Sequence, residues 1–496
     1  MNRPLPQDAP RDFRINEMFF STTDRKGVIL SGNDVFVRVS GYARSELVGQ
    51  PHNIIRHPAM PRAVFRLVWE HLQQGLPVAG AIKNLAKDGR YYWVVAFLMP
   101  IKGGYLSVRF KPSSALLPVV EGIYREMCAC ESEHETSGAD RKAGMLAAEK
   151  LMVDALRSRG FESYDVFMRT LLHEELKCRD AQLAAQRRAL FSETLPEGGG
   201  DEPALRASLQ AIHAGGREAY AQLNTLYARL DDFARLSEKL REKSTFVFGL
   251  TKDFRFIAFN AALRAARLGE EGRSLGVIAE YLGTVSEGTT GIVGRMTEQV
   301  GTILVKLRTV VFNLAAARLQ IEMVLSFCAE LAAGLRDNQE TATAAHDRRR
   351  MIEDLQQAFA ETVQRAVKAL AELEHELRSL AAHAEEMRRM VLTLQVAQVG
   401  GMVEAQRLRD DDSFAVMFSD LREGVENTKR ELAELDDISS QLGALANEAP
   451  AIAATISQAV EKMGREVQGL SAADGDMPAP ATTVPAPVAE LESATA

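Results

Sequence analysis

Apolar residues recur in steps of three and four along most of the second half of the chain. One series has a seven-residue spacing and a second fills the positions between: Leu226, Phe233, Leu240, Val247, Phe254 and Ala261, with Leu223, Leu230, Leu236, Leu250 and Ile257. This spacing is typical of helices that pack along a continuous seam. The pattern resumes after residue 277, so two arms of about sixty residues, or roughly 90 Å each, are predicted.

A short polar turn separates the two arms. Residues 268–273 have the sequence LGEEGR, in which Gly269 and Gly272 bracket the turn. Glycine adopts the positive φ that reverses a chain without a steric clash. The two arms are therefore expected to fold back as an antiparallel helical hairpin.

A second hairpin is predicted further along the chain. Its ascending arm carries Ala366, Leu370, Leu373, Leu377, Leu380, Ala384, Met387, Val391 and Leu394. Residues 399–421 follow, and then a descending arm with Leu421, Val425, Leu432, Leu435, Leu442 and Leu445. We expect this arm to be interrupted at Pro450, because proline lacks the backbone donor that a helix needs.

The two turns resemble each other. Residues 263–268, LRAARL, align with VEAQRL at 403–408, and residues 274–277, SLGV, align with SFAV at 413–416; between them, 269–273 align with the shorter 409–412. Two helices alone leave an apolar seam uncovered. We infer an internal duplication in which one chain supplies both hairpins of a four-helix bundle. In the competing interpretation, residues 399–421 are an ordinary helix break and the chain dimerises.

The first hundred residues have a different pattern. Two short β-like runs flank the turn DRKG, three stretches with helical spacing follow, and three strand-like runs separated by KDGR and KGG complete the series. The strand-like runs are residues 19–23, 28–31, 78–85, 91–99 and 105–110, and the helical stretches begin at 33, 45 and 60. This order predicts an α+β module in which helices cover one face of an antiparallel sheet.

These patterns divide the chain into six parts. The connector contains helix-like stretches at 116–131, 141–158 and 164–191 and ends in the linker PEGGGDEP. The fold class is thus an α+β domain followed by a mainly α region of long antiparallel hairpins in a four-helix coiled-coil bundle. The parts are a flexible arm (1–16), the α+β module (17–112), the helical connector (113–203), the first hairpin (204–336), the second hairpin (337–470) and a disordered tail (471–496).

Composition narrows the class of protein. The chain has 496 residues and a net charge of −8, which disfavours binding to nucleic acid or to an anionic membrane surface. No uncharged window reaches the ~18–20 apolar residues of a membrane span. Four scattered cysteines indicate a reduced, cytoplasmic protein. Cys128 and Cys130 followed by His134 would suit a metal, but no second ligand pair accompanies them.

The α+β module resembles a PAS domain. Residues 19–61 and the run KDGRYYWVV at 87–95 are most similar to the flavin-binding PAS domain of the aerotaxis receptor (Aer) family, and PHNIIRHPAMP at 51–61 is the specific part. This resemblance implies a non-covalent FAD that reports redox state or oxygen. It places the cofactor at Arg56, His57, Trp69, Asn84, Tyr92 and Trp93. Ala59 and Val78 depart from the family, which usually has Asp and Trp there.

The residues themselves are compatible with a flavin without requiring one. Trp69, Trp93 and Tyr92 would supply a flat slot, Asn84 an amide and Arg56 a cation for the diphosphate. In the alternative interpretation Trp69 is a core residue of an amphipathic helix and Arg56-His57-Pro58 only ends a helix. Haem held by His57 or His71 is a further alternative.

The first turn resembles the hairpin tip of chemoreceptor (methyl-accepting chemotaxis protein) signalling domains. The match covers NAALRAARLGEEGRSLGVIAEYL, residues 260–282. It implies contact with the kinase CheA and the coupling protein CheW, and it allows contact with other chemoreceptors. The implied tip residues are Asn260, Arg267, Glu270, Glu271 and Arg273, with Glu404 and Arg407 in the second copy.

Some positions depart from the chemoreceptor pattern. Lys252 stands where the family has a trimer-contact Phe, and Arg264 replaces a Glu that Glu404 keeps in the second copy. These changes count against standard receptor-trimer packing more than against CheW or CheA contact. Glu385-Glu386 is the nearest approach to a methylation pair, and we interpret it as a solvated helix face.

No enzyme is expected, since nucleotide-binding GxxxxGK[ST] and zinc HExxH motifs do not occur. The hypothesis is a cytoplasmic sensor in which a change at the PAS pocket alters helix packing and biases a two-state bundle. The alternative is an adaptor or scaffold of chemoreceptor arrays, with a cofactor-free PAS domain as an interaction module.

Overall fold

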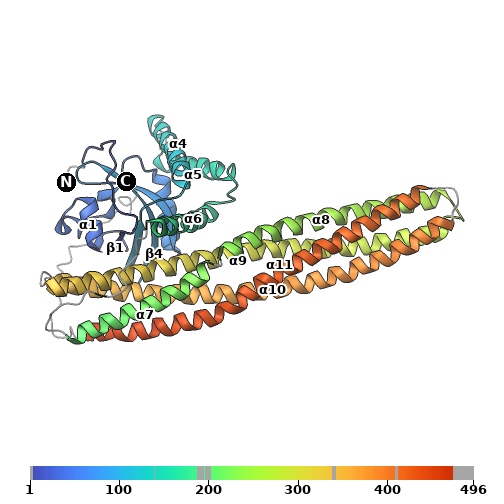
Figure 1. The fold of residues 1–496 in the computed structure, drawn as a ribbon. Helices are drawn as coiled ribbons and strands as arrows, with labels where there is room; N and C mark the ends of the chain where they lie inside the picture. Colours follow the sequence, from blue (N-terminus) through green and yellow to red (C-terminus); the bar gives the residue numbers. More distant parts are fainter. Residues whose placement is uncertain are drawn as a thin grey trace. The chain divides into compact units, whose positions relative to one another are not determined.

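The computed structural model describes residues 4–138, 140–186, 195, 203–228, 230–337, 342–407 and 412–472. Two compact units divide it. We call the first the sheet unit, which comprises residues 1–224, 311–364 and 454–496, and the second the tip unit, which comprises residues 225–310 and 365–453. The predicted fold class is confirmed: an α+β module is followed by long helices (Figure 1).

The α+β module has a five-stranded antiparallel sheet in the order β2-β1-β5-β4-β3. Its strands are β1 (Met18–Asp24), β2 (Ile29–Gly32), β3 (Val78–Leu85), β4 (Tyr91–Ile101) and β5 (Gly104–Phe110). Between β2 and β3 lie α1 (Asp34–Ser40), α2 (Arg44–Leu47), the 3-10 helix η1 (His52–Ile55) and α3 (Arg62–Gln73). Every predicted strand and helix of this module is present.

Asn33 shows how sequence determines local structure here. Its side-chain Oδ1 accepts hydrogen bonds from the backbone N–H of Phe36 at 3.2 Å and of Phe20 at 3.0 Å. One asparagine therefore caps α1 and ties that helix to β1, as expected for this residue at an N-cap.

The predicted flexible arm is wrong for residues 7–15. The backbone N–H groups of Gln7 and Arg11 donate to the carbonyls of Gly89 and Tyr91, and Phe13 and Ile15 are buried. The segment pairs with the start of β4, and the side chains of Phe13 and Ile15 become buried.

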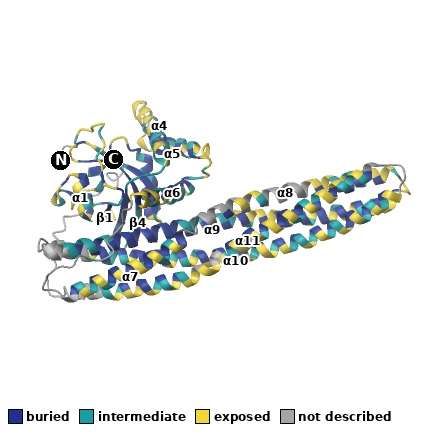
Figure 2. Ribbon diagram, viewed as in Figure 1, coloured by how far each residue is buried: buried dark blue, intermediate teal, exposed yellow. Residues whose placement is uncertain are grey.

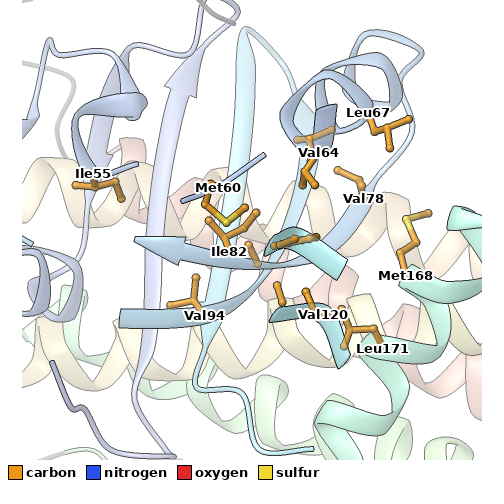
Figure 3. Close-up of a cluster of buried hydrophobic side chains, with 14 of the residues drawn as sticks. Ile55, Met60, Val64, Leu67, Val78, Ile82, Val94, Val120, Met168 and Leu171 are labelled. Atoms are coloured by element: carbon orange, nitrogen blue, oxygen red, sulfur yellow. The ribbon is translucent and has the colours of Figure 1, made fainter. Parts of the chain in front are cut away.

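The connector packs against the same core instead of standing apart from it. Its helices are α4 (Leu116–Thr136), α5 (Arg141–Arg157) and α6 (Tyr164–Ala185). Figure 3 draws Val120 of α4, Met168 and Leu171 of α6 and Val94 of β4 within one cluster of buried hydrophobic side chains. All four belong to one hydrophobic cluster that also includes Val64 of α3. The predicted linker at 196–203 lies outside the described residues, apart from Pro203.

Five long helices complete the chain. They are α7 (Pro203–Ala228), α8 (Leu230–Arg267), α9 (Arg273–Asp337), α10 (Ala342–Arg407) and α11 (Asp412–Ala472). The expected interruption at Pro450 is wrong, because α11 continues through it. Proline removes only one helical hydrogen bond, and buried residues on both sides, Leu442 and Ala453, keep this helix packed.

In the tip unit, side-chain contacts join α8, α9, α10 and α11 in a ring. Arg295 of α9 pairs with Glu386 of α10 at 3.0 Å, and Arg388 of α10 pairs with Asp436 of α11. Lys243 of α8 pairs with Glu431 of α11 at 2.8 Å, and α8 meets α9 at the first turn. Buried residues recur along all four of these helices (Figure 2). One chain thus supplies both antiparallel hairpins of a four-helix bundle.

The last turns of α10 lie beside the first turns of α9 in the tip unit. A Cβ added at Gly400, just before the second turn, would lie 4.0 Å from Ile278 Cδ1, just after the first. Helix α10 ends at Arg407 and α11 begins at Asp412, and the predicted second turn at 409–412 lies outside the described residues apart from Asp412. This is the arrangement that the inferred duplication requires.

One described helix, α9, is long and apolar enough to cross a membrane by length and composition. Its most apolar window is 56% buried. A core helix of a bundle passes the same test, so this is weak evidence for a span.

Candidate functional site

The two faces of the sheet carry different chemistry. Successive residues of a strand point to opposite faces, so Arg109 and Phe110 of β5 are on different sides. We call the side of Arg109, which meets η1 and α1, the inner face, and the side of Phe110, which meets α6, the outer face.

Arg109 is a buried cation on the inner face, with 4% of its surface exposed. Its Nη2–H donates to Ser21 Oγ at 2.9 Å and to His52 Nε2 at 2.7 Å, and its guanidinium lies 5.6 Å from the Phe36 ring centroid. None of these neighbours is acidic. A buried cation without a carboxylate is unfavourable, so the arrangement suits an acceptor-bearing ligand.

The pKa directions at this cluster have one main cause. Burial lowers the pKa of Arg109 to about 10, only partly offset by Tyr92. Burial, and then the charge of Arg109, holds the pKa of His52 well below its usual range. His52 is therefore neutral at pH 7, and its Nε2 accepts the hydrogen bond that the Arg109 guanidinium donates.

Further polar atoms on the inner face lack partners within the described chain. They are Asn84 Nδ2, Tyr92 Oη, Ser107 Oγ and Arg109 Nη1, all of them buried. Asn84 and Tyr92 are directly opposed in the β3–β4 register, so they share a face. Buried polar groups are nearly always hydrogen-bonded in native proteins. Orphans gathered on one face therefore indicate a ligand.

Of the six predicted cofactor residues, the structure brings only Asn84 and Tyr92 to this cluster. Trp93 follows Tyr92 in β4 and so lies on the outer face, with its ring centroid 6.3 Å from that of Tyr124. Trp69 packs on Tyr105 at 5.3 Å, and Tyr105 pairs with Pro100 at the opposite end of β4 from Tyr92. Trp69, Trp93 and Tyr92 do not form a common slot.

The side chains of Arg56 and His57 form hydrogen bonds with residues that follow closely in the sequence. Arg56 Nη2–H donates to the Met60 carbonyl at 3.1 Å, and the guanidinium lies 4.2 Å from the Phe65 ring centroid. His57 Nδ1 accepts from the Ala59 N–H at 3.0 Å. Burial, and then Lys83, lowers the pKa of His57 to about 4. The backbone of Arg56 bridges to Asn84, so this pair borders the inner-face cluster.

Most of the predicted tip residues are exposed to solvent. Arg267, Glu270, Glu271 and Arg273 are exposed and Asn260 is half-buried, while Glu270 pairs with Arg273. In the second copy, exposed Arg407 pairs with half-buried Glu404 at 3.1 Å.

Sequence reasoning missed Arg109, His52, Ser21 and Ser107. A signal was present, because Arg109 interrupts the otherwise uncharged run GYLSVRF of β5. Its partners were not predictable, since Ser21 and His52 come from β1 and η1.

The five-stranded antiparallel sheet, with its helices inserted between β2 and β3, has the architecture of a PAS fold. Residues 29–106 match the family described as the PAS fold.

Similar proteins agree with this class. The aerotaxis receptor of Escherichia coli (strain K12) is 40% identical over 133 residues, 26% of this chain and 25% of that one. The biofilm dispersion protein BdlA of Pseudomonas aeruginosa is 32% identical over 82 residues, 16% of this chain and 20% of BdlA. The matched region thus spans a quarter or less of each relative's length. Together with the PAS match, these relatives support a PAS domain in this chain.

Solved PAS structures are also similar. The PAS domain of a protein from Colwellia psychrerythraea is 25% identical, covering 19% of this chain and 85% of that domain, with a TM-score of 0.17. The Aureochrome1 LOV domain is 22% identical, covering 21% of this chain and 88% of that one, with a TM-score of 0.19. Scores this low add nothing to the assignment.

Proposed function

We propose that this chain is a cytoplasmic transducer, not an enzyme, that senses redox state or oxygen through FAD on the inner face of its sheet and signals by contact with CheA and CheW. The cofactor proposal rests on Arg109, a buried guanidinium without an acidic partner within the described chain.

The residues of the inner face fit an isoalloxazine ring. The pyrimidine edge of that ring presents two carbonyls that accept hydrogen bonds and one N–H that donates. Arg109 Nη1, Asn84 Nδ2 and Tyr92 Oη are buried donors without partners in the described residues, and Ser107 Oγ can also accept. Bound flavin would supply one- and two-electron redox chemistry. The chain's own residues would orient the ring, exclude water and place a positive charge beside it.

The tip unit supports output by contact. Its surface carries two apolar stripes, one on each hairpin, at positions that the repeat relates. Leu263 and Val277 in the first copy correspond to Val403 and Val416 in the second, and all four are about half or more exposed. The stripes continue through Phe256 and Phe259 and through Leu392, Val396 and Val399. Exposed apolar patches rimmed by charge typically mark protein-binding surfaces.

Arg109→Met tests the cofactor. The wild-type chain is expected to be purified with flavin absorbance or to bind added FAD, and R109M to bind it at least about tenfold more weakly, because a buried charge-assisted hydrogen bond is lost. Arg38→Met is the matched control, since Arg38 is exposed and pairs with Glu17. A wild-type chain that neither carries nor binds flavin would contradict the cofactor proposal.

The adaptor alternative has its own supporting observation. Phe19 and Tyr92 stack with ring centroids 5.8 Å apart, and the inner face is otherwise closed by aliphatic side chains such as Val94. A colourless chain that co-sediments with CheA and CheW would favour an array scaffold. A chain that binds flavin but does not co-sediment with CheA and CheW would support the proposed sensing and contradict the proposed output.

A further inference from the structure

A second polar cavity lies at the edge of the sheet and shares no residue with the inner-face cluster. It has a volume of about 80 Å³ and is lined by residues of β1 and β2, by the turn between β4 and β5 and by one turn of α10. All of these segments belong to the sheet unit. A buried water needs roughly 10–15 Å³ of such volume, so this edge cavity has room for a ligand of about six non-hydrogen atoms.

Two residues with hydroxyl groups line one wall of the edge cavity. Thr22 of β1 and Ser31 of β2 are paired across the strands, and their Oγ1 and Oγ atoms are 2.6 Å apart. Each hydroxyl carries one proton, and the hydrogen bond between them uses only one of the two. The pair therefore keeps one O–H donor that a ligand can use.

The wall formed by α10 is held in place by packing. Met351, which lines the cavity, is 2% exposed. Gln320 of α9 donates to Thr362 Oγ1 of α10 at 3.1 Å, and Phe20 of β1 packs edge-on against Phe327 of α9 with ring centroids 4.9 Å apart. The strands and α10 are thus ordered without a ligand, which lowers the entropic cost of binding one.

Three charged side chains line the edge cavity without partners. Lys102 of the β4–β5 turn and Arg350 of α10 are exposed, and Asp354 of α10 is half-buried. Among the described residues, no hydrogen bond or ion pair engages any of the three. Burial raises the pKa of Asp354, and the charge of Arg350 offsets this only in part. The cavity therefore offers two cationic donors and one carboxylate that lacks a donor.

This lining favours an oxyanion that still carries a proton. A guanidinium and an ammonium group form strong, charge-assisted hydrogen bonds with phosphate oxygens. A carboxylate can only accept, so Asp354 needs an O–H from the ligand. Inorganic phosphate keeps at least one O–H at pH 7, whereas sulfate keeps none. A phosphate monoester, whose second pKa is about 6, has lost most of its own at that pH.

We propose that the edge cavity is a binding site for inorganic phosphate. Lys102, Arg350 and the unused O–H of the hydroxyl pair donate to phosphate oxygens, and Asp354 accepts from the phosphate O–H. The ion has five non-hydrogen atoms and so fits the volume of the cavity. Bound phosphate ties the β4–β5 turn to α10, and this assignment does not depend on the proposed flavin or on the tip unit.

Calorimetric titration of the full-length chain at pH 7 tests the site with three anions. Inorganic phosphate should bind with a dissociation constant of about 1 mM or tighter. Sulfate and methyl phosphate should bind at least about tenfold more weakly, because they leave Asp354 without a donor. Asp354→Asn should remove this preference, since an amide can donate to sulfate. Arg350→Met should weaken phosphate binding at least about tenfold.

Glu361→Gln is the matched control and should bind phosphate like the wild-type chain. Glu361 is an exposed acid of α10 that accepts a hydrogen bond from Gln357, and neither residue lines the cavity. Absence of phosphate binding, equal binding of phosphate and sulfate by the wild-type chain, or unchanged binding in R350M would each overturn the proposal. The comparison of anions on the wild-type chain needs no variant to fold. No readout uses flavin, so a colourless chain that binds phosphate contradicts only the proposed sensing.

Discussion

At the scale of the residue, His71 forms a polar link between α3 and α6. Its Nε2 lies 2.8 Å from Asp165 Oδ1 and its Nδ1 2.8 Å from the Leu67 carbonyl oxygen. Both ring nitrogens face acceptors, which requires the imidazolium form. The hydrogen bond to Asp165 accordingly raises the pKa of His71 despite partial burial.

This link predicts a pH dependence with a definite sign. A raised pKa in the folded state stabilises the fold below pH 6.5, the ordinary value, and that contribution is lost as the pH rises through the folded pKa. His71→Gln should therefore lose about 0.5–1 kcal/mol at pH 6 and much less at pH 9. Thermal unfolding of both chains across this range measures the difference.

A second variant identifies the partner. Asp165→Asn should flatten the same pH dependence, because the pair is removed from its other side. Comparing each variant with wild type is necessary, since burial lowers the pKa of His52 and His57 and gives them the opposite slope below pH 6.5. A variant H71Q whose stability follows wild type at every pH would contradict the link.

Residue types alone could not select the candidate site. Tyr92 and Trp93 are equally suitable chemically, but strand alternation allows only one of them on the inner face. Asn84 joins Tyr92 because the β3–β4 register opposes them. Arg109 meets Ser21 and His52 through strand pairing and the position of η1, which depend on tertiary packing and not on local pattern.

At the scale of the element, hydrophobic periodicity was sufficient to predict a helix or a strand wherever one face of the segment is buried. The predicted strands and the long helices follow from spacings of two and of three to four. The exceptions are segments whose state is decided by distant contacts. Residues 7–15 become ordered by pairing with the start of β4, and α11 passes through Pro450 because its neighbours hold it.

The first turn allows a prediction about glycine. Gly269 has φ +60° and open space around it, whereas a Cβ on Gly272 would lie 2.2 Å from the Ala265 carbonyl oxygen. Gly269→Ala should cost about 1 kcal/mol through its left-handed backbone. Gly272→Ala should cost more, about 2–3 kcal/mol, because backbone atoms must move apart. Hydrogen exchange across residues 260–282 measures both.

Gly269→Asn provides the control for backbone strain. Asparagine tolerates the left-handed region, so this variant should exchange nearly like wild type. Equal effects of G269A and G272A would show that close approach at Gly272 does not limit this turn.

At the scale of the whole molecule, the internal duplication determines how the apolar seam is covered. The sequence predicted two related hairpins, and the tip unit closes their four helices into one ring of contacts. It did not predict that the sheet also covers α9. That contact depends on single residues of α6 and α9, such as Arg179 and Glu322, which no periodic pattern distinguishes from surface charges.

A chain that supplies both hairpins needs no second copy to bury its seam. We therefore expect a mass in solution of 54.5 kDa, that of one chain, at micromolar concentration. The exposed stripes through Phe259 and Val399 should add only weak, concentration-dependent association, because their apolar residues are spread over two hairpins. Light scattering coupled to size exclusion measures this, with Phe259→Ser combined with Val399→Ser as the variant that should abolish any association. A stable dimer that persists on dilution and in this variant would mean that the bundle is completed between chains.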